Sequence, residues 1–174
     1  NTYRKDADTV PCRRYRDYRQ DFSRDESNYV GGVAIYPDKG GIIINYPEQH
    51  IANGRKKNVA TNHHYKKMVR IMKKMRYLME DSGNAIYRYA AGNVSSFMLE
   101  SLLWNIEDSW YTENCGSYRK VFAFYQLIST LRNRKGSFSN YKEANGIKLL
   151  CPSDRDCEHL CEFLDQLASF YDYE

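Results

Sequence analysis

The strongest pattern along the chain is a stripe of apolar side chains between residues 65 and 79. Its members recur three and four positions apart, which predicts a helix with one buried face: Tyr65, Met68, Ile71 or Met72, Met75, and Leu78 or Met79. Thr61 or Asn62 can cap the start of this helix, and Asp81-Ser82-Gly83 is expected to end it. Further helices are expected at about residues 95–106, 118–134 and 153–170.

The first third of the chain has the pattern of strands. Strands are expected at residues 6–12, 29–36 and 41–46, and the turn sequence Pro37-Asp38-Lys39-Gly40 predicts that the last two form a hairpin. Residues 12–27 are too charged for a core strand, so we expect an extended or looped excursion there. The polar, basic residues 49–59 indicate a connector. Strands followed by helices predict an α+β chain that ends in a helical bundle.

Composition narrows the class of protein. With 42% hydrophobic and 28% charged residues, the chain resembles a soluble globular protein. It contains no apolar run of about 18 residues and no signal-peptide pattern, which argues against a membrane protein. The chain opens on Asn1 rather than Met, directly before a predicted strand, so we expect a piece of a longer protein.

The chain contains five cysteines, and an odd number of cysteines without a secretion signal indicates reduced thiols and a cytoplasmic location. Four residues near the C-terminus suggest a metal cluster: Cys151, Cys157, His159 and Cys161. Their spacing matches no common zinc module, and Phe163, Leu164 and Leu167 continue an ordinary apolar stripe. Buried thiols in a helix are therefore the favoured interpretation.

Charge is unevenly distributed, although the net charge is only +4. Residues 49–79 contain no Asp or Glu, whereas acidic residues concentrate in residues 154–174. This asymmetry predicts a polyanionic partner, either nucleotide phosphates or nucleic acid. The basic residues that gather in the middle of the chain are Arg55, Lys56, Lys57, Lys66, Lys67, Arg70, Lys73, Lys74 and Arg76.

Two helices offer groups suited to an anion. Lys66, Arg70 and Lys73 share one face of the first helix, where they can hold phosphates or simply form a solvated basic face. In the second helix, Ser96 lies at the start, where hydroxyl and backbone N–H groups bind anions, and Phe97 can stack on a base. The alternative for that pair is a capping serine and a core phenylalanine. Glu100, one turn after Ser96, is expected either as a buried partner of the basic residues in the segment 49–59 or as an exposed surface acid.

A set of motifs resembles the C-terminal portion of the cGAS/DncV-like nucleotidyltransferases over roughly residues 6–110. The motifs are Ala7-Asp8-Thr9-Val10-Pro11-Cys12 with Tyr15 and Arg16, Asn45-Tyr46-Pro47 with His50, Thr61 to Lys73, and Ser96-Phe97 with Glu100 and Leu103-Trp104-Asn105. The resemblance implies that residues 1–58 are the C-terminal part of a nucleotidyltransferase palm sheet. It also implies that residues 59–174 are a helical domain that grips the nucleotide.

The same resemblance implies roles for individual residues. Asp8 would be the third acidic residue of the catalytic metal site, and Lys73 would contact the donor triphosphate. Ser96 would contact phosphate and Phe97 the nucleobase. Mg²⁺, or Mn²⁺ in its place, would serve as cofactor, and ATP or GTP would be joined into cyclic or linear oligonucleotide second messengers for antiphage signalling. Regulatory or effector proteins of an antiphage operon are the implied partners.

The sequence departs from the family pattern in one respect. A Gly-Ser loop followed at a suitable distance by Asp-x-Asp, which supplies the first two metal carboxylates, does not precede Asp8. We therefore expect the chain to be inactive without an N-terminal half of the same enzyme. The alternative function is a basic helical module that binds nucleic acid without catalysis, in which case binding should fall steeply with salt.

Overall fold

The computed structural model describes residues 10–18, 27–116 and 120–171. It divides into two compact units, Asn1–Gln49 and His50–Glu174. The first unit contains a three-stranded antiparallel sheet in the order β1-β2-β3. The second unit is helical, so the predicted α+β class, with strands followed by a helical bundle, is confirmed.

The sheet contains the predicted hairpin and one strand that the sequence analysis missed. Strands β2 (Val30–Ile35) and β3 (Ile43–Asn45) pair around the predicted turn. Strand β1 (Arg13–Asp17) lies in the segment that we expected to be an extended or looped excursion. Its backbone is extended and it is not a core strand, as expected, but it pairs with β2, which was not predicted. Its arginines are exposed on an edge strand, a position that tolerates charge. Of the strand predicted at residues 6–12, residues 6–9 lie outside the described residues and 10–12 form no strand.

Helix α1 (Pro47–Ala60) replaces the connector expected at residues 49–59. The helix has no apolar stripe, since only Gly54 and Lys57 are buried along it. Pro47 occupies its first turn, where a missing backbone N–H has no cost. The prediction of a connector was therefore wrong because the helix is polar on nearly every face.

Helix α2 (His64–Asp81) is the predicted long helix and ends where predicted. Its start differs in detail, because His63, with a φ of 64°, lies at the cap position and makes no side-chain cap hydrogen bond. Thr61 still satisfies part of this end, since its hydroxyl accepts the Tyr65 N–H at 3.1 Å.

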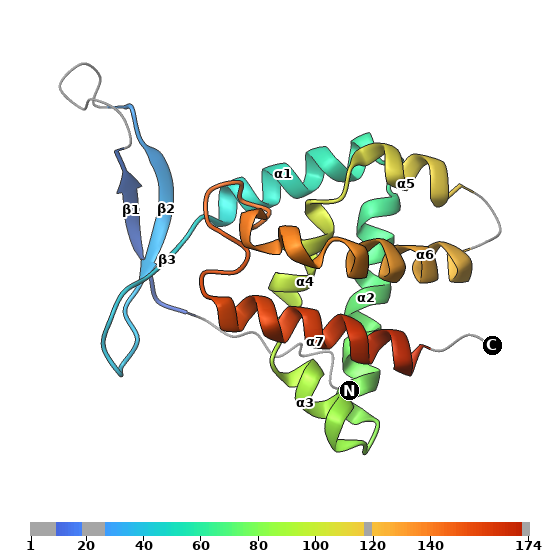
Figure 1. Cartoon of the computed structure of the whole chain (residues 1–174). Helices are drawn as coiled ribbons and strands as arrows, with labels where there is room; N and C mark the ends of the chain where they lie inside the picture. Colours follow the sequence, from blue (N-terminus) through green and yellow to red (C-terminus); the bar gives the residue numbers. More distant parts are fainter. Residues whose placement is uncertain (1–9, 19–26, 117–119, 172–174) are drawn as a thin grey trace, which may run out of the picture. The chain divides into compact units, whose positions relative to one another are not determined.

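The remaining helices include two that sequence reasoning did not predict, α3 and α5, which have eight and seven residues. Both are too short to show a clear helical period. The three later predicted helices are present with bounds that differ by two residues at most. In chain order the elements (Figure 1) are α3 (Ala85–Gly92), α4 (Ser96–Trp104), α5 (Asp108–Asn114), α6 (Lys120–Asn133), the 3₁₀ helix η1 (Lys135–Asn140) and α7 (Asp154–Phe170).

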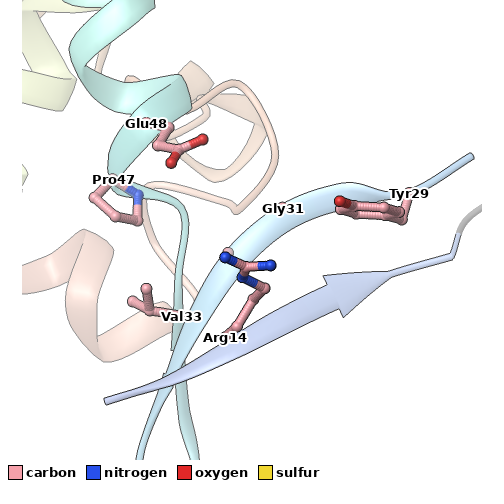
Figure 2. Close-up of a pocket in the computed structure, with 7 residues that line it drawn as sticks. Arg14, Tyr29, Gly31, Val33, Pro47 and Glu48 are labelled. Carbon is pink, nitrogen blue, oxygen red and sulfur yellow. The ribbon is translucent and has the colours of Figure 1, made fainter. Parts of the chain in front are cut away.

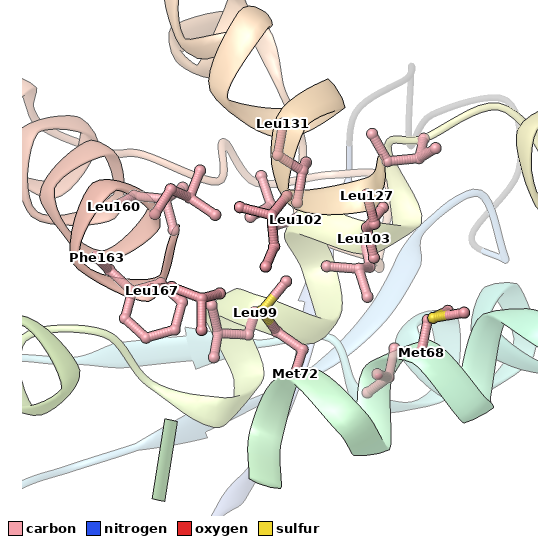
Figure 3. Close-up of a cluster of buried hydrophobic side chains, with 14 of the residues drawn as sticks. Met68, Met72, Leu99, Leu102, Leu103, Leu127, Leu131, Leu160, Phe163 and Leu167 are labelled. Atoms are coloured by element: carbon pink, nitrogen blue, oxygen red, sulfur yellow. The ribbon is translucent and has the colours of Figure 1, made fainter. Parts of the chain in front are cut away.

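The core of the second unit forms where α2 packs on α3, α4, α5 and α7, and where α6 packs on α7. The apolar stripe of α2 points inward, with Met72 fully buried. Figure 3 shows side chains from four helices meeting in this cluster. Its labelled members are Met68, Met72, Leu99, Leu102, Leu103, Leu127, Leu131, Leu160, Phe163 and Leu167.

Candidate functional site

The first turn of α4 presents Ser96 and Phe97 at the surface of the second unit. Ser95 precedes the helix in an extended conformation, and its hydroxyl accepts the Met98 N–H at 3.0 Å. The backbone N–H groups of Ser96 and Phe97, the first two residues of the helix, have no acceptor within the helix and can donate to an anion. The Phe97 side chain is 44% exposed, which contradicts the alternative of a core phenylalanine.

Glu100, one turn further along α4, contacts a lysine and a histidine from two other helices. Its Oε2 lies 2.6 Å from the Nζ of Lys73 on α2, and its Oε1 lies 3.6 Å from the Nε2 of His50 on α1. All three side chains are largely buried, with exposed fractions of 28% for Lys73, 20% for Glu100 and 15% for His50. The neighbouring His50 ring and the Lys73 ammonium together hold the pKa of Glu100 at about 2.

The ring of Phe97 stacks on the ring of His50, with 4.7 Å between centroids and 23° between planes. This contact fixes one face of the phenylalanine and leaves the exposed part of its ring to a ligand. The Nδ1 atom of His50 is buried and has no hydrogen-bond partner within the described residues. Glu100, His50 and Phe97 thus form one connected group.

Tyr77 connects α2 to the start of α4 at a second point. Its hydroxyl lies 3.4 Å from the Ser96 hydroxyl, and either atom can be the donor. Tyr77 follows Lys73 by one helix turn, so the two side chains lie on the same stripe of α2. Lys73, Ser96 and Phe97, three of the predicted site residues, are therefore brought together by contacts through Glu100, His50 and Tyr77.

Lys66 and Arg70 lie on the same stripe of α2, two turns and one turn before Lys73. Arg70 is exposed and Lys66 is half-buried. Among the described residues, no hydrogen bond or ion pair joins either side chain to Ser96, Phe97 or Glu100. Neither side chain is therefore fixed within the cluster.

Two of the basic residues counted in the sequence are structural. The Nζ of Lys57 donates to the carbonyl of Ile106 at 2.5 Å and to Oδ1 of Asp108 at 2.7 Å, and Lys57 is 8% exposed. Arg76 donates through Nε to the carbonyl of Val94 at 2.6 Å. The Lys57 ammonium and the Arg76 guanidinium are therefore engaged within the fold. The number of basic residues in the sequence is larger than the number that can bind a polyanion at the surface.

The predicted metal residue, Asp8, lies outside the described residues. Within the described ranges, no group of three or more His, Cys, Asp or Glu side chains could hold a metal ion. Near the C-terminus, Cys151 is buried, and Cys157 and Cys161 are half-buried. Burial raises the pKa of the Cys151 and Cys161 thiols, which favours their protonated form.

The first unit has a separate hollow of about 440 Å³ on one face of its sheet (Figure 2). Arg14 and Val33 are register partners across β1 and β2 at this face. Gly31 forms part of the hollow, and a Cβ there would meet only Tyr29, at 3.8 Å. None of the residues predicted for nucleotide binding lines this hollow.

Sequence reasoning missed the positions of His50 and Glu100 in the site. Both residues belong to the motifs of the resemblance, and Glu100 was expected either as a buried partner of the basic residues in the segment 49–59 or as an exposed surface acid. The structure buries it against His50 of that segment and against Lys73 of α2. A weak signal was present, because Glu100 is the single charged residue in a helix whose other residues are apolar or serine. An isolated carboxylate on a buried helix needs a positive partner.

Among the described residues, none of the helices combines the length and the apolar composition that a membrane span requires.

Comparisons with known proteins agree with the resemblance. A cyclic GMP-AMP synthase, CdnE03, from Staphylococcus schleiferi is 44% identical over 99% of this chain and 51% of that protein. A cyclic dipyrimidine nucleotide synthase, CdnE, from Cecembia lonarensis is 42% identical over 61% of this chain and 33% of that protein. The chain therefore spans about half, or less, of the length of these relatives.

A solved structure has the same fold. It is the CdnE cyclic dinucleotide synthase of Elizabethkingia meningoseptica with GTP and Apcpp, which covers 99% of this chain with a TM-score of 0.79 and 28% identity. The chain covers 60% of that structure. Residues 52–172 match the family described as the cGAS/DncV-like nucleotidyltransferase C-terminal helical domain. The chain therefore belongs to the cGAS/DncV-like nucleotidyltransferases and carries their C-terminal helical domain.

Proposed function

We propose that this chain is the nucleotide-gripping part of an enzyme that joins nucleoside triphosphates into cyclic or linear oligonucleotide second messengers. The observation that carries the proposal is the cluster in which side-chain contacts bring Lys73, Ser96 and Phe97 together. The chain's membership of the nucleotidyltransferase family supports the same proposal. A lysine, a helix N-terminus and an aromatic ring on one surface match the triphosphate and base of a nucleotide.

Each member of the cluster has a role in this proposal. The Lys73 ammonium contacts the triphosphate, and Lys66 and Arg70 add positive potential along the same stripe of α2. The hydroxyl and amide of Ser96 donate to phosphate oxygens. Phe97 stacks on the base with the part of its ring that His50 leaves uncovered. Because Lys73 and Phe97 are already held by neighbours, binding costs them little conformational entropy.

The proposed reaction is attack of a ribose hydroxyl of one nucleotide on the α-phosphate of another. A phosphodiester bond forms, the bond to the β-phosphate oxygen breaks, and pyrophosphate leaves with the proton taken up by solvent. ATP and GTP are the proposed substrates, since a relative is named a cyclic GMP-AMP synthase. The described residues supply no metal site, so the proposed Mg²⁺, or Mn²⁺, depends on Asp8 together with carboxylates from outside these 174 residues.

We further propose that the chain alone is inactive and that an N-terminal half completes the enzyme. The family motif of a Gly-Ser loop and two more carboxylates does not precede Asp8 in this sequence. We propose antiphage signalling in the cytoplasm, with regulatory or effector proteins as partners, as the biological role, and membership of the family supports this proposal.

The test is to incubate the full-length gene product with Mg²⁺ and mixed nucleoside triphosphates and to separate the products by chromatography. We expect new phosphodiester-linked oligonucleotides, which should disappear with Asp8→Ala. Lys73→Ala should weaken apparent nucleotide affinity, whereas Lys74→Ala, which changes an exposed neighbour on the same helix, should not. No product from the full-length protein, or equal effects of the two lysine variants, would contradict the proposal.

A further inference from the structure

Glu100 lies between the lysine proposed to hold phosphate and the rings proposed to hold the base. One carboxylate oxygen is 2.6 Å from the Lys73 Nζ, and the other is 3.6 Å from the His50 Nε2. His50 in turn stacks on Phe97 at 4.7 Å between centroids. Lys73 and Phe97 come from different helices, α2 and α4, and Glu100 connects the two through side-chain contacts.

The backbone at Glu100 is itself held from α2. Its carbonyl accepts the hydroxyl of Tyr65 at 3.0 Å, and Tyr65 is fully buried. The carboxylate therefore projects from a fixed point, and its side chain is only 20% exposed. An ion pair with this little solvent access restricts the Lys73 side chain far more than a pair at an open surface does.

A carboxylate beside a phosphate-binding lysine is unfavourable for raw phosphate affinity. It cancels one positive charge and repels the oxygens of a polyphosphate. A site selected only for anion affinity would lack Glu100. Its presence is explained if the carboxylate improves the geometry of a ligand that contacts lysine and rings at the same time.

We propose that Glu100 is a positioning residue that couples the phosphate contact of Lys73 to the base contact of Phe97, so that the site favours an intact nucleoside triphosphate over inorganic polyphosphate. This inference rests on the proposed function, because it assumes that both contacts are made by one nucleotide. Glu100 itself touches neither ligand group. It acts by fixing Lys73 and, through His50, the plane of Phe97.

Replacing Glu100 by glutamine separates the two effects. The amide keeps the size of the side chain but removes its charge, so the Lys73 ammonium loses its ionic partner and the net charge of the site rises by one. Tripolyphosphate should then bind as tightly as before or more tightly. The affinity advantage of a nucleotide over tripolyphosphate should fall by at least about threefold, as expected when residues in one network are uncoupled.

The experiment measures dissociation constants by calorimetry on the full-length gene product. The probes are tripolyphosphate and an ATP or GTP analogue with a methylene group between the α- and β-phosphates. A double-mutant cycle of Lys73→Ala and Phe97→Ala is measured with the analogue, once with Glu100 and once with Glu100→Gln. Glu80→Gln is the matched control, because it removes a carboxylate from an ion pair with Arg76 on the same helix, at 3.2 Å, without touching Lys73.

We expect the changes in analogue affinity caused by Lys73→Ala and Phe97→Ala to be non-additive when Glu100 is present and additive in the Glu100→Gln background. In the Glu80→Gln background the coupling between Lys73 and Phe97 should equal that of the wild type. Additive effects in the wild type, or unchanged coupling in Glu100→Gln, would overturn the inference. If Glu100→Gln does not fold by circular dichroism, Glu100→Asp decides, since its shorter side chain keeps the charge but cannot span both partners. A wild type that binds tripolyphosphate but not the analogue would instead contradict the proposed function.

Discussion

Lys57 offers the sharpest test of the helical unit, because a buried ammonium holds two segments together. We predict that Lys57→Met destabilises the second unit by about 2–3 kcal/mol. The side chain of Lys57 is 8% exposed and its Nζ donates at 2.5 Å to the carbonyl of Ile106, a residue that is 1% exposed. Methionine has a similar length but no donor, so that carbonyl loses its partner.

The magnitude is the sum of unequal parts. An unpaired buried carbonyl costs about 1–3 kcal/mol. The ion pair with Asp108 adds less than about 1 kcal/mol, because that carboxylate is 50% exposed and water can replace the lysine. The ammonium also lies 5.4 Å from the ring centroid of Tyr111 and 5.9 Å from that of Tyr65, and desolvated contacts of this kind contribute about 1–2 kcal/mol. The cost of burying the ammonium, which methionine avoids, offsets part of this sum.

The assay is urea unfolding followed by tryptophan fluorescence, since both tryptophans, Trp104 and Trp110, lie in the second unit. With a slope of about 2 kcal/mol per molar urea, the midpoint should fall by about 1 M. Lys56→Met is the control, because Lys56 is the exposed neighbour on the same helix and should change stability by less than about 0.5 kcal/mol. Equal midpoints for the two variants would refute the structural role of Lys57.

Three further predictions test the site, the core and the sheet. The pKa of Glu100 is lowered to about 2, so the extra free energy of unfolding that the wild type has over Glu100→Gln should be fully present above the ordinary carboxyl pKa of about 4.5 and should be lost as the pH falls toward 2. Urea unfolding of both proteins at pH 6 and pH 3 measures this difference in stability, and an equal difference at the two pH values would contradict the prediction. Leu102→Ala, at a fully buried position, should cost about 2–5 kcal/mol, whereas Ile86→Ala, at a position 57% exposed, should cost less than about 0.5 kcal/mol in the same urea assay. Gly32→Ala should weaken the sheet more than Gly31→Ala, because a Cβ at Gly32 would lie 2.8 Å from the Asn45 carbonyl oxygen; hydrogen exchange of the β2 and β3 amides compares the two, and equal protection would argue against the close approach.

The elements that the sequence predicted are those with a strong local signal. The hairpin follows from its turn residues, and α2 and α7 follow from apolar stripes that the structure buries. Helix α1 gave no such signal, because it buries only a glycine and a lysine. Its helical state depends on contacts with distant segments, such as the hydrogen bond from Asn53 to the Ala144 carbonyl at 2.9 Å. Interactions of this range cannot be read from local periodicity.

The same limit explains what was missed in the site. Lys73, Ser96 and Phe97 could be chosen because each lies in a motif and at a suitable position on a predicted helix. His50 is 50 residues away from Glu100 along the chain, and their proximity depends on how α1, predicted as a connector, packs in the second unit. A residue whose helix is not predicted cannot be placed next to a partner.

The basic run between residues 49 and 79 shows how tertiary structure divides like charges into different roles. Lys57 and Arg76 donate hydrogen bonds to backbone carbonyls, and Lys73 forms an ion pair with Glu100. The basic side chains left exposed are Arg55, Lys56, Lys67, Arg70 and Lys74. If the run served mainly to bind nucleic acid, these exposed residues would carry the affinity, and the logarithm of the binding constant would fall steeply with the logarithm of the salt concentration. If it serves a nucleotide, Lys73→Ala should have the larger effect and salt the smaller one, because a fixed and partly buried ammonium is screened less than an exposed one.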